Sequence, residues 1–80
     1  MTGSQVSRLD RITVDPAIVH GKPVVRGMRM AVQTILELLA SGMTFDEVLA
    51  DFPYLERDDL LAALEYGALA SSGQQVIATS

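Results

Sequence analysis

The sequence predicts one mainly α-helical domain, a three-helix bundle of the helix-turn-helix type with a short β-strand or hairpin at its N-terminal end. Its second half repeats apolar residues at helical spacing in three separate stretches. The last two stretches are joined by a tight turn that contains a proline, which is typical of a helix-turn-helix unit. Before residue 30, short β-branched runs bounded by glycine and proline indicate extended backbone instead. Homeodomain-like and winged-helix-like bundles share this plan.

Length and composition indicate a single small domain with an aliphatic core and no disulfide bonds. The 80 residues are enough for one hydrophobic core, and aliphatic side chains must fill it because tryptophan is absent. Cysteine is also absent, so no disulfide framework forms. The most apolar stretch, residues 31–40, is interrupted by Gln33, Thr34 and Glu37 and is too short to span a membrane. We therefore expect a cytoplasmic protein without a membrane anchor.

The N-terminal third is expected to be partly extended. Residues 1–10 are polar and lack periodicity, which predicts a flexible arm, so the folded domain spans residues 11–70. The alternation from Arg11 to Val14 predicts a half-buried strand, which ends at a turn through Pro16. After a second turn at Gly21, residues 24–26 predict another extended segment that ends at Gly27. The two segments together predict a small hairpin or a pair of edge strands.

The first two helices have clear limits. The first carries apolar residues at helical spacing from residue 31 onward, namely Val32, Ile35, Leu36 and Leu39. Gly42 provides its stop, because glycine adopts the left-handed conformation without strain. Thr44 and Glu47 have the spacing of a capping box, which predicts that the second helix starts there. Pro53 prevents that helix from continuing.

The third helix is expected to begin near Glu56 and to run to about residue 70, where its apolar pattern stops. Asp58 and Asp59 lie in its first turn, where the helix dipole favours carboxylates. Gly67 lowers the intrinsic stability of the helix by roughly 1 kcal/mol relative to alanine, so we expect close packing at this position. Residues 71–80 are expected to form a flexible tail, and a short strand through residues 76–77 is the alternative.

Charge is distributed unevenly along the chain. The net charge is −4, but residues 1–30 carry +3 and residues 31–80 carry −7. Any surface that binds phosphates must therefore involve the N-terminal third, where Lys22, Arg26 and Arg29 lie close together in sequence. These cations offer a site for phosphates or for a partner's carboxylates, unless they pair with acids of the chain itself. The candidate internal partners are Asp46, Glu47 and Asp51.

The predicted third helix is poorly suited to reading base edges. DNA-reading helices usually offer Arg, Lys, Asn or Gln to the major groove. Here Arg57 stands alone beside Asp58 and Asp59. The candidate contacts to DNA or to a protein partner are therefore Lys22, Arg26, Arg29 and Arg57.

Nothing in the sequence predicts catalytic residues, a cofactor or a metal site. His20 is the single histidine, and local spacing gives it neither a nucleophile nor a second metal ligand. The adjacent acids in residues 46–47 and 58–59 point to different sides of their helices, so they do not form acid–base pairs. A chain of this length also has little room for a substrate pocket. We therefore expect that the protein is not an enzyme and that it does not bind a small-molecule substrate.

Four segments together resemble a known family. They are Ile12–Pro16, the run Gly21-Lys22-Pro23-Val24-Val25-Arg26-Gly27-Met28-Arg29-Met30-Ala31-Val32, Leu39–Thr44 and Phe52–Leu55. The pattern is similar to the domain-of-unknown-function-433 family over most of the chain. The resemblance implies a helix-turn-helix fold, self-association, and the antitoxin role in a toxin–antitoxin pair whose toxin is a PIN-like nuclease. Two positions depart from the family pattern: Met28 replaces a small threonine, and Glu56 replaces a threonine or serine cap.

Two functions follow as expectations. In the first, the chain is an antitoxin that covers the basic RNA-binding face of a nuclease with its acidic helices or with residues 71–80. In the second, it is a homodimeric regulator that contacts operator DNA through Lys22, Arg26 and Arg29, while the third helix reads few bases. Pairing of edge strands in a dimer would double the basic patch. The two functions are compatible, because antitoxins commonly repress their own genes.

Overall fold

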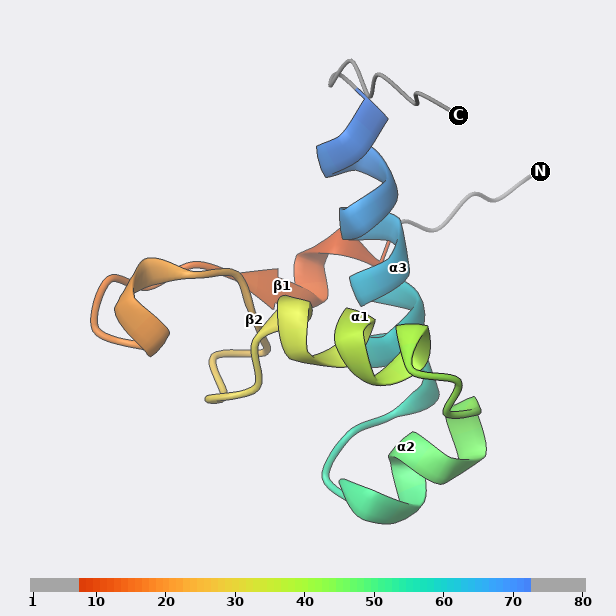
Figure 1. Ribbon diagram of the computed structural model, residues 1–80. Helices are drawn as coiled ribbons and strands as arrows, with labels where there is room; N and C mark the ends of the chain where they lie inside the picture. Colours follow the sequence, from red (N-terminus) through yellow and green to blue (C-terminus); the bar gives the residue numbers. More distant parts are fainter. Residues whose placement is uncertain (1–7, 73–80) are drawn as a thin grey trace, which may run out of the picture.

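The computed structural model describes residues 8–72, which form three α-helices and a small two-stranded antiparallel sheet. In chain order the elements are a 3-10 turn (Leu9–Arg11), β1 (Ile12–Thr13), a second 3-10 turn (Val19–Gly21), β2 (Val24–Val25), α1 (Val32–Ala40), α2 (Phe45–Asp51) and α3 (Arg57–Ser72). α1 crosses the long helix α3, and α2 and the strands lie on opposite sides of α1 (Figure 1). This architecture confirms the prediction of a mainly helical fold with a small N-terminal sheet.

The sheet is shorter than the sequence predicts. Ile12 of β1 lies opposite Val25 of β2, and Thr13 lies opposite Val24. The strand predicted over residues 11–14 is observed only at residues 12–13. Arg11 instead completes a 3-10 turn, and Val14, which is 61% exposed, lies beyond the end of β1. Residues 14–23, which we call the arm, project away from the helices before the chain returns as β2 (Figure 1).

The limits of the first two helices follow the predicted local signals. α1 ends at Ala40, and Gly42 follows with a φ of 105°, a conformation that suits glycine. The predicted capping box is confirmed at the start of α2. The Glu47 amide donates to the Thr44 hydroxyl at 3.1 Å, and the Thr44 amide donates to the Glu47 carboxylate at 2.8 Å. The capping box therefore gives the Thr44 and Glu47 backbone amides hydrogen-bond acceptors that the helix itself does not provide.

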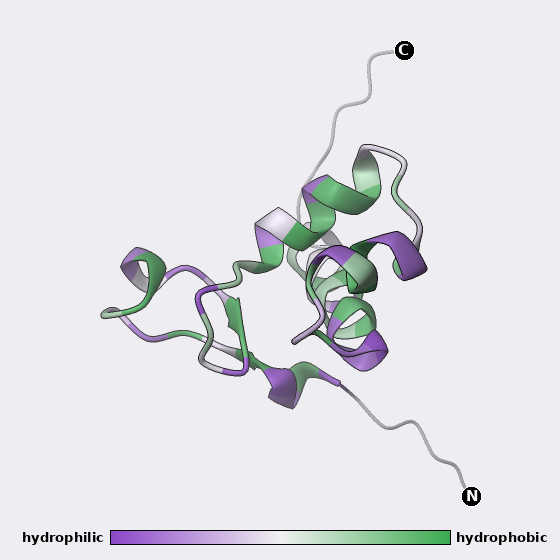
Figure 2. Cartoon of the chain, turned by 90° about the horizontal axis from the view of Figure 1, so that it is seen from below, coloured by the Kyte–Doolittle hydropathy of each residue, from purple (hydrophilic) through white to green (hydrophobic). Residues whose placement is uncertain are grey.

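One hydrophobic core joins the strands to all three helices. Val25 from β2, Ile35 from α1, Val48 from α2 and Leu60 from α3 are fully buried in it. Figure 2 shows hydrophobic ribbon in each helix and in the strands, with hydrophilic turns around them. No helix among residues 8–72 has the length and the apolar composition needed to cross a membrane.

Gly67 explains how α1 and α3 approach each other. A Cβ atom at this position would lie 3.1 Å from Cδ1 of Leu36 on α1, which is closer than ordinary van der Waals contact. The absence of a side chain therefore lets the two helices pack tightly, as the sequence predicts for this glycine.

The folded part extends beyond the predicted limits at both ends. Residues 8–10, which the sequence predicts to be part of a flexible N-terminal segment, belong to the fold. The Arg8 amide donates to the Glu65 carboxylate at 3.1 Å, and Leu9 begins the first 3-10 turn. α3 continues through Ser72, two residues past its predicted end. The rest of the predicted terminal segments, residues 1–7 and 73–80, lies outside the described residues.

Candidate interaction surfaces

The first turn of α3 contains a buried carboxylate that arginines surround. Asp59 is completely buried. Its Oδ1 accepts hydrogen bonds from Arg11 Nη1 at 2.9 Å and Arg26 Nε at 3.1 Å. Its Oδ2 accepts from Arg26 Nη2 at 2.7 Å and from the Glu56 amide at 2.8 Å. We call these four residues the Asp59 cluster; the bidentate Arg26 contact is the strong geometry for an arginine–carboxylate pair.

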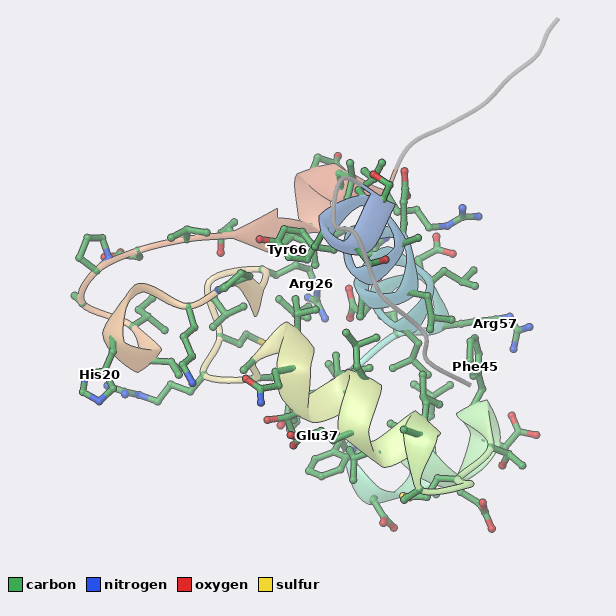
Figure 3. All side chains as sticks on the ribbon, turned by 45° about the horizontal axis from the view of Figure 1, so that its top comes forward. His20, Arg26, Glu37, Phe45, Arg57 and Tyr66 are labelled. Atoms are coloured by element: carbon green, nitrogen blue, oxygen red, sulfur yellow. The ribbon has the colours of Figure 1, made fainter. Side chains whose placement is uncertain are left out.

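The hairpin brings the two arginines of the Asp59 cluster together. Because Ile12 pairs with Val25, the residues just outside that pair, Arg11 and Arg26, become neighbours, and the Arg26 amide donates to the Arg11 carbonyl at 2.7 Å. Arg26 has a φ of 48°, a left-handed conformation that is uncommon for residues other than glycine. Its Nη2 also donates to the Tyr54 carbonyl at 3.0 Å. In Figure 3 the Arg26 side chain points from β2 towards α3.

The cluster holds Asp59 in its charged form. Burial alone raises the pKa of this carboxyl group, because burial disfavours the charge. Hydrogen bonds from Arg26, from the Glu56 amide and from Arg11 outweigh burial, so the pKa of Asp59 lies below its ordinary value. The pKa of Arg26 is raised chiefly by its hydrogen bond to Asp59, and that of Arg11 chiefly by its hydrogen bond to Glu56. The charges therefore stabilise one another across the hairpin–helix junction.

Three more ion pairs extend this junction at the surface. Arg11 Nη1 lies 2.7 Å from Glu56 Oε1, Arg11 Nη2 lies 3.7 Å from Asp58 Oδ2, and Arg8 Nε lies 3.2 Å from Asp58 Oδ1. Arg26, expected from the sequence to pair with acids at residues 46, 47 or 51, pairs with Asp59 instead, so those three partner assignments are wrong. Much of the N-terminal positive charge is thus neutralised inside the fold.

The structure separates the four candidate binding residues instead of gathering them. Arg26 is held in the Asp59 cluster. Arg57 begins α3, and its guanidinium carbon lies 4.9 Å from the centre of the Phe45 ring (Figure 3). Lys22 in the arm and Arg29 in the loop after β2 are exposed, and neither forms an ion pair with another described residue. Of the four candidate residues, Lys22 and Arg29 are therefore the two N-terminal cations that stay unpaired within residues 8–72.

The tip of the arm has an unusual backbone. Val19, His20 and Gly21 have φ values of 48°, 57° and 80°, so three successive residues adopt the left-handed conformation. For a β-branched residue such as Val19 this conformation is an outlier. His20 lies at the far end of the arm, away from the helices (Figure 3). Within residues 8–72, no group of histidine, aspartate and glutamate side chains is arranged to hold a metal ion.

The opposite charge collects on α1 and α2. Residues 30–56 contain no lysine, arginine or histidine. They carry four exposed acids that form no ion pair with other described residues, and we call these the acidic surface: Glu37, Asp46, Glu47 and Asp51. Figure 3 shows Glu37 on the side of α1 away from α3, and carboxylate side chains projecting outward around α2.

An apolar groove of about 320 Å³ lies between α1 and the last turns of α3. Its lining is uncharged and consists of Pro23, Val32, Gln33, Leu36, Tyr66, Gly67, Ala70 and Ser71. The sequence reasoning did not identify this groove. Its one signal in the sequence is Gly67, which lines the groove next to Leu36.

Comparisons with known proteins agree on the family of the fold. A family model described as "Protein of unknown function (DUF433)" matches residues 12–67. A crystal structure of a DUF433 member protein from Anabaena variabilis is similar, with a TM-score of 0.70 and 30% sequence identity. The match covers 74% of this chain and 58% of that protein, so this chain spans little more than half of the other's length. A search of curated proteins finds no match.

Proposed function

This chain belongs to the DUF433 family, and from that premise we propose that it is an antitoxin that binds a PIN-like nuclease. The family resemblance supplies the class of partner. The proposal includes a cytoplasmic location and a helix-turn-helix identity for α2 and α3. In this role the acidic surface covers the positively charged face through which the nuclease binds RNA.

The observation that carries this proposal is the acidic surface. The acids at the start of α3 pair with Arg8, Arg11 and Arg26, so they are not available to a partner. The four acids on α1 and α2 form no ion pair with a cation among residues 8–72. An exposed surface of one sign, without compensating charges, attracts a partner surface of the opposite sign and speeds association. An RNA-binding face has the required positive charge.

Asp51→Lys is the sharpest test of the acidic surface. Asp51 is the last residue of α2, where a helix end favours a cation, so lysine there does not destabilise the helix. Asp46 and Glu47 are unsuitable, because they lie in the first turn of α2 and Glu47 belongs to the capping box. Asp10→Lys makes the same charge change on the other side of the molecule, in the first 3-10 turn, and serves as the matched control.

The binding partner in this test is the product of the reading frame next to the gene for this chain, purified as an active ribonuclease. We expect the wild-type chain to inhibit RNA cleavage, Asp51→Lys to slow association by about tenfold at low salt, and Asp10→Lys to stay within about twofold. The proposal fails if the purified chain does not inhibit the nuclease, or if both lysine variants slow association equally.

Two exposed cations, Lys22 in the arm and Arg29 in the loop after β2, support a second function, contact with operator DNA. The start of α3 is not free to enter a major groove, because its carboxylates bind Arg8, Arg11 and Arg26 of the N-terminal segment. Lys22 and Arg29, in contrast, are exposed and unpaired among residues 8–72. In this second proposal they contact phosphates, as the wing of a winged-helix domain does, and a homodimer presents two copies of them.

A salt-titrated binding assay with the operator duplex and a scrambled duplex tests whether Lys22 and Arg29 contact phosphates. Each phosphate contact that is lost lowers the slope of log K against log salt by about 0.9. We expect the double variant Lys22→Ala/Arg29→Ala to lower the slope by about 2 per protomer. Arg57→Ala is the control, because Arg57 lies on α3 beside Phe45, and it should leave the slope unchanged. An unchanged slope in the double variant would show that Lys22 and Arg29 do not contact the DNA.

A further inference from the structure

The apolar groove lies where the described part of the chain ends. Ala70 and Ser71 line the groove, and Ser72 is the last described residue of α3. Leu36 and Val32 of α1 form the opposite side, and Tyr66 contributes a ring from the preceding turn of α3. Eight residues follow Ser72, with the sequence Gly-Gln-Gln-Val-Ile-Ala-Thr-Ser. The chain therefore continues directly from one wall of an apolar groove.

We propose that this groove is the docking site for the chain's own C-terminal segment, with Val76 and Ile77 as the residues that enter it. They are the two large aliphatic side chains of residues 73–80. Ile77 is the fifth residue after Ser72, and five residues span about 17 Å when extended, at about 3.3 Å each, which is enough to follow the groove. Gly73 suits a reversal of the chain, because a glycine after a helix end readily takes the left-handed conformation.

The chemistry of the groove and the segment matches. Neither the lining residues nor residues 73–80 carry a charged side chain. Burial of two aliphatic side chains therefore removes apolar area from water without leaving a charge unpaired. Residues 74–75 are glutamines, whose amides can remain in water. Neither the residues of the acidic surface nor Lys22 and Arg29 line the groove, so this docking is independent of both proposed functions.

The short connection favours the segment of the same chain over that of a second copy. A segment tethered by a few residues has an effective concentration in the millimolar range. At micromolar protein concentrations, the same segment from another molecule competes at roughly a thousandfold disadvantage. The docking is therefore intramolecular.

Disulfide trapping tests this placement, because the chain has no cysteine of its own. Gln33 lines the groove, and Ala78 follows the proposed anchors, so the double variant Gln33→Cys/Ala78→Cys should form an intramolecular disulfide under mild oxidation. Thr34→Cys/Ala78→Cys is the control, because Thr34 is exposed on α1 beside Gln33 but does not line the groove. We expect at least tenfold faster crosslinking in the first variant than in the control. Equal rates, or a predominantly dimeric product, would overturn the proposal.

A second measurement, acrylamide quenching of Tyr66 fluorescence, leaves all lining residues of the groove unchanged. In a Tyr54→Phe background Tyr66 is the sole tyrosine, and tryptophan is absent, so fluorescence reports on the groove alone. Val76→Ser/Ile77→Ser should raise the acrylamide quenching constant of Tyr66 about twofold, because water and quencher then enter the groove. Gln74→Ser/Gln75→Ser changes the same segment without touching the anchors and should leave quenching unchanged. The proposal is wrong if neither variant changes quenching or if both change it alike.

Discussion

The two ends of α3 are held in different ways. At its start, Asp59 is completely buried, and both of its carboxylate oxygens accept two hydrogen bonds. At its end, Leu69 is 54% exposed, and the neighbouring residues line an apolar groove. The start is thus fixed by directional charge contacts to the N-terminal segment, whereas the last turns have apolar surface left over. The difference separates the part of the helix that specifies the fold from the part that can bind another segment.

Two leucines of α3 give the largest contrast. Leu60 is completely buried, so Leu60→Ala leaves a cavity and should lower the free energy of unfolding by about 3 kcal/mol, within the usual range of 2–5 for such a change. Leu69→Ala removes a half-exposed side chain and should cost less than about 0.5 kcal/mol. Urea unfolding followed by circular dichroism measures both. Equal losses would mean that the end of α3 is packed as firmly as its start.

Asp59→Ala should be nearly as disruptive. It removes the partner of two guanidinium groups and one backbone amide, and breaking a buried ion pair costs about 3 kcal/mol or more. Asp58→Ala is the neighbouring control: the Asp58 side chain is 49% exposed, and its ion pairs with Arg8 and Arg11 should together contribute less than about 1 kcal/mol. A loss at Asp58 that matches the loss at Asp59 would contradict the central role of the buried carboxylate.

The stability difference between the wild type and Asp59→Ala should depend on pH. The folded-state pKa of Asp59 is lowered, so its contribution is fully present above the ordinary aspartate pKa of about 3.9. It is lost as the pH falls through the lower folded-state value. The difference in unfolding free energy between wild type and Asp59→Ala should therefore stay constant from pH 7 to about pH 5 and shrink below about pH 4. A constant difference down to about pH 2 would show that the charge of Asp59 is not what stabilises the junction.

Gly67→Ala should have a small net effect, because two opposing contributions nearly cancel. Alanine gains roughly 1 kcal/mol of helix propensity over glycine. Its Cβ would lie 3.1 Å from the flexible end of Leu36, and the adjustment of that side chain offsets the gain. We expect a net change within about 1 kcal/mol, measured by urea unfolding. A loss well above that value would show that Leu36 is fixed by its surroundings.

The elements that the sequence predicts well depend on neighbours in the chain. The capping box at Thr44 and the stop at Gly42 involve residues within one helical turn, so their spacing in the sequence is sufficient to identify them. The close packing at Gly67 is also confirmed, because a glycine inside a helix is costly without a structural reason.

The Asp59 cluster, in contrast, could not be found in this way. Asp59 appears in the sequence as an ordinary acid of a first helical turn, and the structure buries it. Its partners Arg26 and Arg11 are 33 and 48 residues away in the chain. The contact requires the hairpin to pack against α3 in the folded chain, and the left-handed backbone of Arg26 has no signature in the sequence. The groove depends on long-range packing in the same way.

The long separation in the Asp59 cluster has a consequence for how the chain acquires its structure during synthesis. A ribosome that adds about 5–20 residues per second needs roughly 2–10 seconds to pass from Arg11 to Asp59. The two-residue strands can pair within microseconds of their emergence, but the arginines beside them wait, fully hydrated, for an acid that has not yet been made. The contact between the first and last parts of the domain therefore cannot form until the ribosome has passed Asp59 in the first turn of the third helix, so translation sets the earliest moment at which the nascent chain can complete its fold.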